Sequence, residues 1–271
     1  MSLKTFSAAA VSFAFLAAVA TGQQVANPIP AATRSQADCT GFITKSSLST
    51  DITVFNGGNN DLASKIRQYT PGEPVYLRSR SKSSFSVGEE FSLVRPANKI
   101  FRTTRYNGEH WAIRALGKPF EDVGKVTVTN VTPEGAVAEV NYTCTPVVGG
   151  DIAMVYQPRP IPTYVPKELD RFALPNGNKV GVIAAARTNY SSLMLGDIVY
   201  LNLGKKDGVE PGQRYRVYFI RYKTSVSLGT PPTPRETVGE VIVLSTQEKS
   251  SAAIIINAKR NIDVGYGVEL E

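Results

Sequence analysis

The sequence predicts an all-β protein, in which two tandem copies of a small β-barrel-like module are joined by a proline-rich linker. Three observations lead to this fold class: an internal repeat, apolar residues that alternate with polar ones as in strands, and glycine and proline residues that mark turns. Closure of each module into a barrel would also hide the edge strands, which an exported protein must protect from aggregation.

The repeat consists of segments that match in the same order along both copies. Two matches share an offset of 124 positions, and a third has an offset of 115. Upstream of them, residues 41–43 (GFI) are expected to correspond to 181–183 (GVI). The shared order favours duplication over chance similarity. The three matching pairs are 72–77 (GEPVYL) with 196–201 (GDIVYL), 91–94 (FSLV) with 215–218 (YRVY), and 123–128 (VGKVTV) with 238–243 (VGEVIV).

The residues inside the matched segments favour strands and tight turns. Polar and apolar residues alternate over 214–219, as in a half-buried strand, and residues 252–256 form a continuous apolar run that suits a strand buried on both faces. Pro211 and Gly212 provide the fixed φ and the positive φ that a tight turn requires. No helix is expected beyond a turn or two over 60–67.

The amino-terminal residues have the layout of a secretory signal peptide. Lys4 precedes an apolar run over 8–20 that is too short to cross a bilayer, and cleavage is expected after Ala20 or Gly22. The sequence therefore predicts a protein that is periplasmic or secreted, with no membrane span in the mature chain. The expected division is a signal peptide (1–22), a linker (23–37), a first module (38–157), a proline-rich linker (158–176) and a second module (177–271).

Cysteine usage adds one prediction. The chain has two cysteines, Cys39 and Cys144. An even number of cysteines in an exported chain predicts a disulfide rather than a metal site or a nucleophile. Such a bridge would close a loop of about 100 residues, for which the chain-entropy model gives about 4 to 5 kcal/mol. It would stabilise the first module, since the second copy contains no cysteine.

Positive charge is concentrated in one segment of the first module. Residues 66–118 contain ten Lys or Arg residues and four acidic ones, whereas the whole chain has a formal net charge of +7. Such a cluster raises the local concentration of anionic partners, and a charged edge strand that resists self-pairing is the alternative. Arg78, Arg80 and Lys82 would alternate along the strand that follows Tyr76 and point to one face. The predicted ligand-binding residues are Arg78, Arg80, Lys82, Arg95, Lys99, Arg102, Arg105 and Arg114.

Few residues suggest catalysis or metal binding. His110 is the only histidine and stands beside Trp111, with no second histidine or cysteine nearby to complete a zinc site. We therefore expect a polar loop with a packed aromatic residue, no metal, no cofactor and no enzymatic activity. A hydrolase with paired carboxylates is the residual alternative, because the spacing that matters for such a pair is spatial.

The second copy combines several short motifs in a fixed order. They are 181–183, 196–201, 204–212, 215–218, 238–241 and 262–265. This pattern resembles the C-terminal β module of flagellar assembly protein T, and the similar module of LysM-containing peptidoglycan-binding and pilus secretin-associated proteins. The resemblance implies a Gram-negative periplasmic protein that helps to assemble or anchor an envelope machine. It transfers no catalytic residue, and no LysM segment accompanies it here.

Two functional hypotheses follow from these features. The first is a structural adaptor that scaffolds or anchors an envelope assembly through contacts with envelope proteins. The second is a module that binds an anionic polymer or glycan, such as peptidoglycan or lipopolysaccharide, through the basic face of the first copy. Nucleic acid is not an expected partner of an exported protein.

Overall fold

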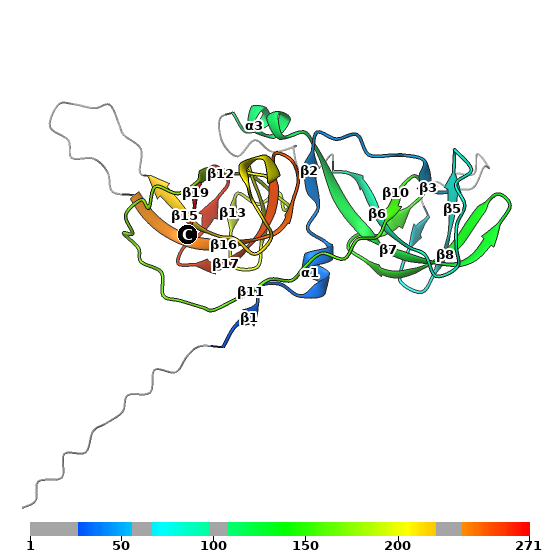
Figure 1. The fold of residues 1–271 in the computed structure, drawn as a ribbon, viewed down its shortest axis with the longest axis horizontal. Helices are drawn as coiled ribbons and strands as arrows, with labels where there is room; N and C mark the ends of the chain where they lie inside the picture. The colour runs from blue at the N-terminus through cyan, green and yellow to red at the C-terminus, as the bar shows by residue number, and fades with distance from the viewer. Residues whose placement is uncertain (1–26, 56–66, 98–107, 221–234) are drawn as a thin grey trace, which may run out of the picture.

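The computed structural model describes residues 27–55, 67–97, 108–220 and 235–271. Within these ranges the chain forms two closed six-stranded β-barrels that stand side by side (Figure 1). The predicted fold class, all-β with two tandem barrel-like modules, is therefore confirmed.

Hydrogen-bonded strand pairing closes both rings. In the first barrel β7 pairs with both β6 and β8, and in the second β12 pairs with β19. The first barrel contains β3 (Ile52–Val54), β5 (Pro74–Ser79), β6 (Glu90–Pro96), β7 (Lys118–Thr132), β8 (Gly135–Thr143) and β10 (Ile152–Val155). The second contains β12 (Val180–Ala186), β14 (Ile198–Leu201), β15 (Arg214–Ile220), β16 (Arg235–Thr246), β17 (Ser251–Ala258) and β19 (Gly267–Leu270).

Shorter elements precede, connect and cap the barrels. β2 pairs with β7 outside the barrel ring, and three two-residue pairings join β1 to β11, β4 to β9 and β13 to β18. These elements are β1 (Ile29–Pro30), α1 (Arg34–Asp38), β2 (Phe42–Thr44), β4 (Gln68–Tyr69), α3 (Glu109–Leu116), β9 (Val147–Val148), β11 (Thr163–Tyr164), β13 (Ser192–Leu193), the 3-10 helix η1 (Lys205–Asp207) and β18 (Ile262–Asp263).

Alternate residues of the strands fill the interior of each barrel. In the first barrel Val75, Leu77 and Phe91 belong to one buried cluster. In the second barrel Val199 and Leu201 are buried at the positions that match Val75 and Leu77. The period-2 pattern therefore directs equivalent residues of the two copies into equivalent cores.

The two barrels also share their strand pairing residue by residue. Leu77 pairs with Ala136 in the first barrel, and Leu201 pairs with Ser251 in the second, 124 and 115 positions further along. The irregularity in the pairing of β6 with β7 recurs at the equivalent position between β15 and β16. The pairs β4 with β9 and β13 with β18 likewise occupy equivalent positions. The same strand plan is thus present twice.

One part of the predicted repeat is wrong. Residues 41–43 do not correspond to 181–183, because β2 lies outside the barrel ring, whereas β12 belongs to the second ring. The counterpart of β12 is β3, since Val54 pairs with β5 in the register in which Ile183 pairs with β14. A three-residue motif is too short to fix a register, and β3 lacks the glycine that guided the comparison.

Two short α-helices interrupt the β structure of the described residues, although neither was predicted. The turn expected over 60–67 falls almost entirely on residues outside the described ranges. A capping box between Thr33 and Gln36 begins α1. The buried apolar residues of α3 are only Ile113 and Leu116, too few to produce a helical period in the sequence. No helix in the described part of the chain has both the length and the apolarity needed to cross a membrane.

Candidate functional site at the module junction

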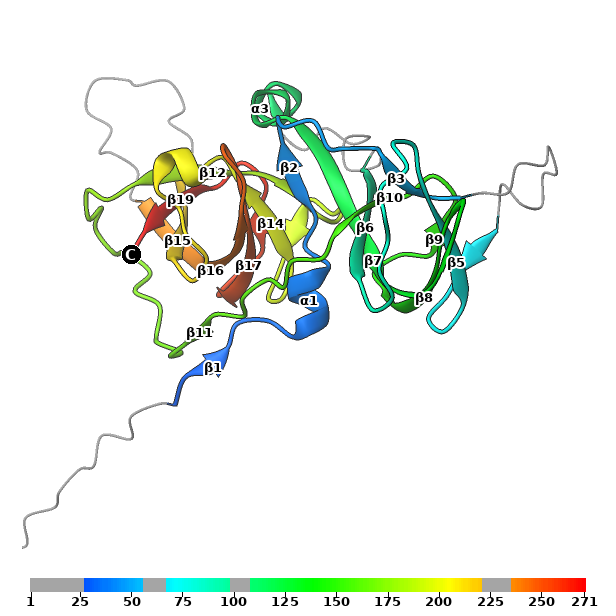
Figure 2. The same cartoon turned by 45° about the vertical axis from the view of Figure 1, so that its right-hand side comes forward.

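One outer face of the second barrel is apolar and is covered by elements that precede it in the chain. Ile198, Tyr200 and Ile254 on this face are at most 4% exposed, and they pack in one cluster with Ile43 of β2 and Leu116 of α3. Figures 1 and 2 both show β2 between the two barrels, with α3 at its end. Full burial of a large apolar side chain stabilises a folded protein by about 1.5 to 3 kcal/mol. Because several such side chains are buried here, the two modules form a packed junction.

Hydrogen bonds across the junction end on backbone carbonyl groups of the segment between α1 and the end of β2. The hydroxyl of Tyr200 donates to the carbonyl oxygen of Thr40 at 2.7 Å, and that of Ser250 donates to the carbonyl oxygen of Ile43 at 2.6 Å. Burial raises the pKa of the Tyr200 phenol above its ordinary value, which keeps the donor protonated. These contacts fix the position of the covering segment as well as its burial.

An arginine from the connection between the barrels forms an ion pair in the same region. The guanidinium of Arg159 lies against the carboxylate of Asp122, with Nη2 2.9 Å from Oδ1, and Nη1 donates to the hydroxyl of Thr40 at 2.8 Å. Asp122 also accepts a hydrogen bond from the backbone N–H of Gly41 at 2.7 Å. This bidentate pair, in which the carboxylate is buried and the guanidinium is partly exposed, holds the connection, the covering segment and the first barrel together.

The two segments that were expected to be linkers contact each other. β1, from the segment 23–37, pairs with β11, from the segment 158–176. The backbone N–H of Ala31 donates to the carbonyl oxygen of Pro162 at 2.8 Å, next to this pair. The extended proline-rich connection is therefore attached to the amino-terminal segment along part of its length.

The predicted disulfide between Cys39 and Cys144 is confirmed, with the two Cα atoms 5.6 Å apart. Cys39 directly follows α1 and Cys144 directly follows β8, so the bridge ties the covering segment to the first barrel. A stable disulfide is typical of proteins from oxidising compartments outside the cytoplasm.

The prediction that Arg78, Arg80 and Lys82 share one strand face is wrong. All three are exposed, but β5 ends one residue after Arg78, and the other two lie in the turn beyond it. Asp51 shapes this turn, since it accepts hydrogen bonds from the backbone and the side chain of Ser81. These hydrogen bonds lower the pKa of Asp51 to about 2. The turn that contains Ser81 donates hydrogen bonds to the Asp51 carboxylate, and β5 therefore ends earlier than the alternation of Arg78, Arg80 and Lys82 predicted.

Arg95 is used within the first barrel. Its Nε atom lies 2.8 Å from Oδ1 of Asp151, and its Nη2 atom donates to Oδ2 of the same residue at 2.9 Å and to the carbonyl oxygen of Pro146 at 2.7 Å. Burial raises the pKa of Asp151, although the neighbouring Arg95 opposes this shift. Arg95 therefore neutralises a buried carboxyl group instead of presenting its charge to a ligand.

The remaining predicted basic residues divide into two groups. Lys99, Arg102 and Arg105 lie outside the described residues. Arg114 lies on α3, with its guanidinium carbon 5.9 Å from the ring centroid of Trp111. Trp111 is 74% exposed, so the expectation of a loop with a packed aromatic residue is also wrong. The predicted basic residues that the structure describes, Arg78, Arg80, Lys82, Arg95 and Arg114, do not form one basic face.

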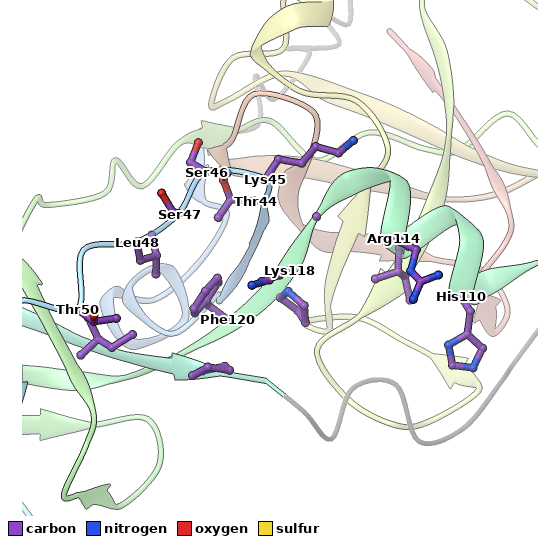
Figure 3. A pocket seen from close by; sticks show the side chains of 15 residues that line it. Thr44, Lys45, Ser46, Ser47, Leu48, Thr50, His110, Arg114, Lys118 and Phe120 are labelled. Atoms are coloured by element: carbon purple, nitrogen blue, oxygen red, sulfur yellow. Dashed lines mark hydrogen bonds between the residues drawn. The ribbon is translucent and has the colours of Figure 1, made fainter.

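A groove of about 860 Å³ opens beside the junction, between α3 and the segment that follows β2 (Figure 3). It brings Arg114 together with Lys45 and Lys118, which the sequence analysis did not select. Figure 3 shows that α3 supplies Arg114 and His110 on one side, while residues 44–50 supply the other. The lining residues are Thr44, Lys45, Ser46, Ser47, Leu48, Thr50, Pro96, His110, Ile113, Arg114, Gly117, Lys118, Pro119, Phe120 and Ile152.

Backbone contacts fix the two walls of this groove. Thr44, at the end of β2, pairs with Lys118, at the start of β7, so that Lys45 and Lys118 lie on neighbouring chain segments. Gly117 joins α3 to β7 with a φ of +130°, and a Cβ atom there would lie 2.1 Å from the carbonyl oxygen of Thr44. Glycine thus allows α3 to end directly against β2.

Comparison of the chain with models of known protein families found no match, and no curated protein matched its sequence. The resemblance of the second copy to the module of flagellar assembly protein T therefore stays a prediction. In the part of the chain that the structure describes, no three His, Cys, Asp or Glu side chains are grouped so that they could hold a metal ion.

Proposed function

We propose that this chain is an exported, non-catalytic adaptor of the cell envelope, periplasmic or secreted, that scaffolds or anchors an assembly through its two β-barrels. The observation that supports this function is the junction, where the Tyr200 hydrogen bond and an apolar cluster attach the second barrel to the covering segment, and the Arg159 ion pair attaches the connection to the first barrel. An adaptor has to keep two binding surfaces at a constant separation. A packed junction provides this, whereas an unattached linker would allow relative domain motion.

Both barrels carry exposed apolar side chains that suit contacts with protein partners. On the second barrel, Tyr190, Met194 and Leu195 lie close together in the sequence between β12 and β14, and each is at least 60% exposed. On the first barrel, Tyr76 is 56% exposed. Tyrosine and methionine are enriched in protein interfaces, so each barrel offers a contact surface of its own.

The proposal is tested by affinity capture from an envelope extract with a tagged chain that lacks residues 1–22. We expect the same envelope proteins to be retained at low and at high salt. Arg159→Ala, which loosens the junction, should lose partners that contact both barrels. Arg171→Ala is the matched control, because Arg171 belongs to the same connection but its side chain is 65% exposed, and its partner Glu236 keeps Arg260 nearby.

Two further measurements keep this test decisive. Circular dichroism shows whether Arg159→Ala is folded, and Tyr200→Phe offers a milder junction variant that removes only one hydrogen bond. Equal retention of partners by the wild type and by both folded junction variants would exclude a role for fixed spacing. Release of soluble fragments from envelope polymer by the purified chain would instead support the hydrolase alternative.

Binding of an anionic polymer or glycan is the second candidate function, and one observation favours it. The groove beside α3 gathers three basic residues, Lys45, Arg114 and Lys118, and no acidic residue lines it. Loss of an insoluble envelope polymer from the captured material as the salt concentration rises would support this function, since salt screens exposed charges.

A further inference from the structure

The three basic residues of the groove line one concavity and form no ion pair with a carboxylate of the described residues. Lys45, Arg114 and Lys118 are exposed, and within the described ranges none of them forms an ion pair, in contrast to Arg95 and Arg159. Three uncompensated positive charges around one concave surface produce a positive potential that attracts an anion.

The floor of the groove is apolar. Phe120 and Ile152 belong to a buried cluster on the outer side of the first barrel, and Leu48 packs against it. The ring of Phe120 stacks on that of Phe42, with centroids 5.4 Å apart, which holds it in place. A ligand in the groove would therefore meet a rigid hydrophobic surface beneath its charged and polar groups.

Hydroxyl groups line the same wall as Lys45. Ser46, Ser47 and Thr50 are exposed, and their hydroxyl groups form no hydrogen bond with other residues in the described part of the chain. A hydroxyl group can donate one hydrogen bond and accept two, so this wall can bind a ligand that carries several hydroxyl groups of its own.

We propose that this groove binds an anionic saccharide, that is, a sugar unit or short oligosaccharide that carries a carboxylate or phosphate group. The basic residues would bind the anionic group, the serine and threonine hydroxyls would bind the sugar hydroxyls, and the apolar floor would contact a C–H face of the ring. The volume of about 860 Å³ lies in the range of small-ligand sites. An acidic peptide could also satisfy these charges, and it is therefore one of the outcomes that the test distinguishes.

This inference rests on the second candidate function, binding of an anionic polymer or glycan, and is independent of the scaffold function. The position of the site provides a spectroscopic probe. Trp111 is the only tryptophan of the chain and lies on α3 between His110 and Arg114, both of which line the groove. We expect saturable changes in tryptophan fluorescence when tetragalacturonate or glucose 1-phosphate is added. The two probes distinguish a carboxylate from a phosphate as the preferred anion. Maltotetraose, which is neutral, and tetraglutamate, which has no sugar, serve as controls.

The variant that tests the site is Lys45→Ser with Lys118→Ser, because it keeps Arg114 beside Trp111. Since each charge-assisted contact contributes substantially to binding, we expect affinity for the preferred probe to fall at least about tenfold, as measured by calorimetry as well as fluorescence. Arg78→Ser with Arg80→Ser removes the same charge outside the groove and should change affinity by less than about twofold. Thermal melting followed by circular dichroism confirms that both variants are folded.

Each other outcome contradicts the proposal. If neither anionic probe produces a saturable signal, the groove does not bind this class of ligand. If maltotetraose binds as well as tetragalacturonate, the basic residues have no role in recognition. If tetraglutamate binds more tightly than both sugars, the partner is an acidic peptide. Equal loss of affinity in the two double variants would mean that net charge, and not the groove, controls binding.

Discussion

The same outer face has opposite properties in the two barrels. On the second barrel Tyr200 is 1% exposed, whereas Tyr76, its equivalent 124 positions earlier, is 56% exposed. Isoleucine at 242, 254 and 256 of the second copy is replaced by Thr127, Glu139 and Asn141 in the first. The first face is open, and the hydroxyl of Thr127 bonds there to the side chain of Asn141.

This difference shows how a duplicated barrel acquires a partner within its own chain. The inner positions of both copies stay apolar, because each barrel needs a core of its own. The outer positions have diverged in polarity, so that one copy receives β2 and α3 while the other remains polar. Residues that differ at matched outer positions therefore mark the interface, and the predictions below test that assignment.

The largest effect on stability is expected at the ion pair between Arg159 and Asp122, which has no equivalent in the second barrel. Asp122 of the first barrel corresponds to Thr237 of the second. Only the first copy therefore has a carboxylate at this position, and Arg159 pairs with it. Arg159→Ala leaves Asp122 buried without its ion pair and should lower the free energy of unfolding by about 3 to 5 kcal/mol in urea titrations. Arg171→Ala, the exposed control, should cost less than about 1 kcal/mol. Equal effects would mean that Asp122 is not buried in solution.

Removal of the disulfide should have the next largest effect. Cys39→Ser with Cys144→Ser should lower the free energy of unfolding by about 2 to 5 kcal/mol, because the loop it closes spans 105 residues. Hydrogen exchange should rise first in the covering segment and in the first barrel, since the second copy has no bridge. A rise that begins in the second barrel would contradict this account of the junction.

Removal of a single hydroxyl group compares the two faces directly. Tyr200→Phe leaves the carbonyl oxygen of Thr40 buried without its donor, and should lower the free energy of unfolding by about 1 to 3 kcal/mol. Tyr76→Phe makes the same chemical change on the exposed face, and should stay within about 0.5 kcal/mol of the wild type. Denaturant titration of both variants measures the difference, and two equal values would contradict the comparison.

The smallest effect concerns a turn that exists only in the first barrel. The pKa of Asp51 lies at about 2 in the folded chain, below its ordinary value of 3.8, because of the hydrogen bonds from Ser81. Its contribution to stability is therefore complete above about pH 4 and is lost as the pH falls through about 2. Asp51→Asn should flatten the pH dependence of stability in this window, and an unchanged dependence would contradict the assignment. An NMR titration of the Asp51 carboxyl group measures its pKa directly.

Much of the fold could be predicted because its signals are local and occur twice. The glycine and proline turns and the alternation over 214–219 specify strands in either copy. The run over 252–256 was predicted to be buried on both faces, and its alternate residues do pack into the barrel core and into the junction. The pairing of residues 41–43 was wrong, because a three-residue motif cannot distinguish a barrel strand from a strand outside the ring.

The candidate site was less accessible to sequence reasoning. A cluster of charges in the sequence does not show which charges are already neutralised, and Arg95 is neutralised by a residue 56 positions away. Lys45 and Lys118 are brought together by the pairing of β2 with β7, which joins residues more than 70 positions apart. The hydroxyl-rich stretch around Lys45 (TKSSLST, 44–50) was the one local signal that could have identified this wall.

Both β2 and α3 precede the barrel whose outer face they cover, and this has a consequence for synthesis. A ribosome delivers Ile43, Ile113 and Leu116 well before Tyr200 and Ile254 emerge, so the first half of the chain spends that interval with its apolar patch uncovered. A nascent chain in this state is prone to aggregate or to bind chaperones. We therefore expect a fragment that ends before residue 177 to aggregate or to bind chaperones far more than the full chain does, even though its barrel is complete.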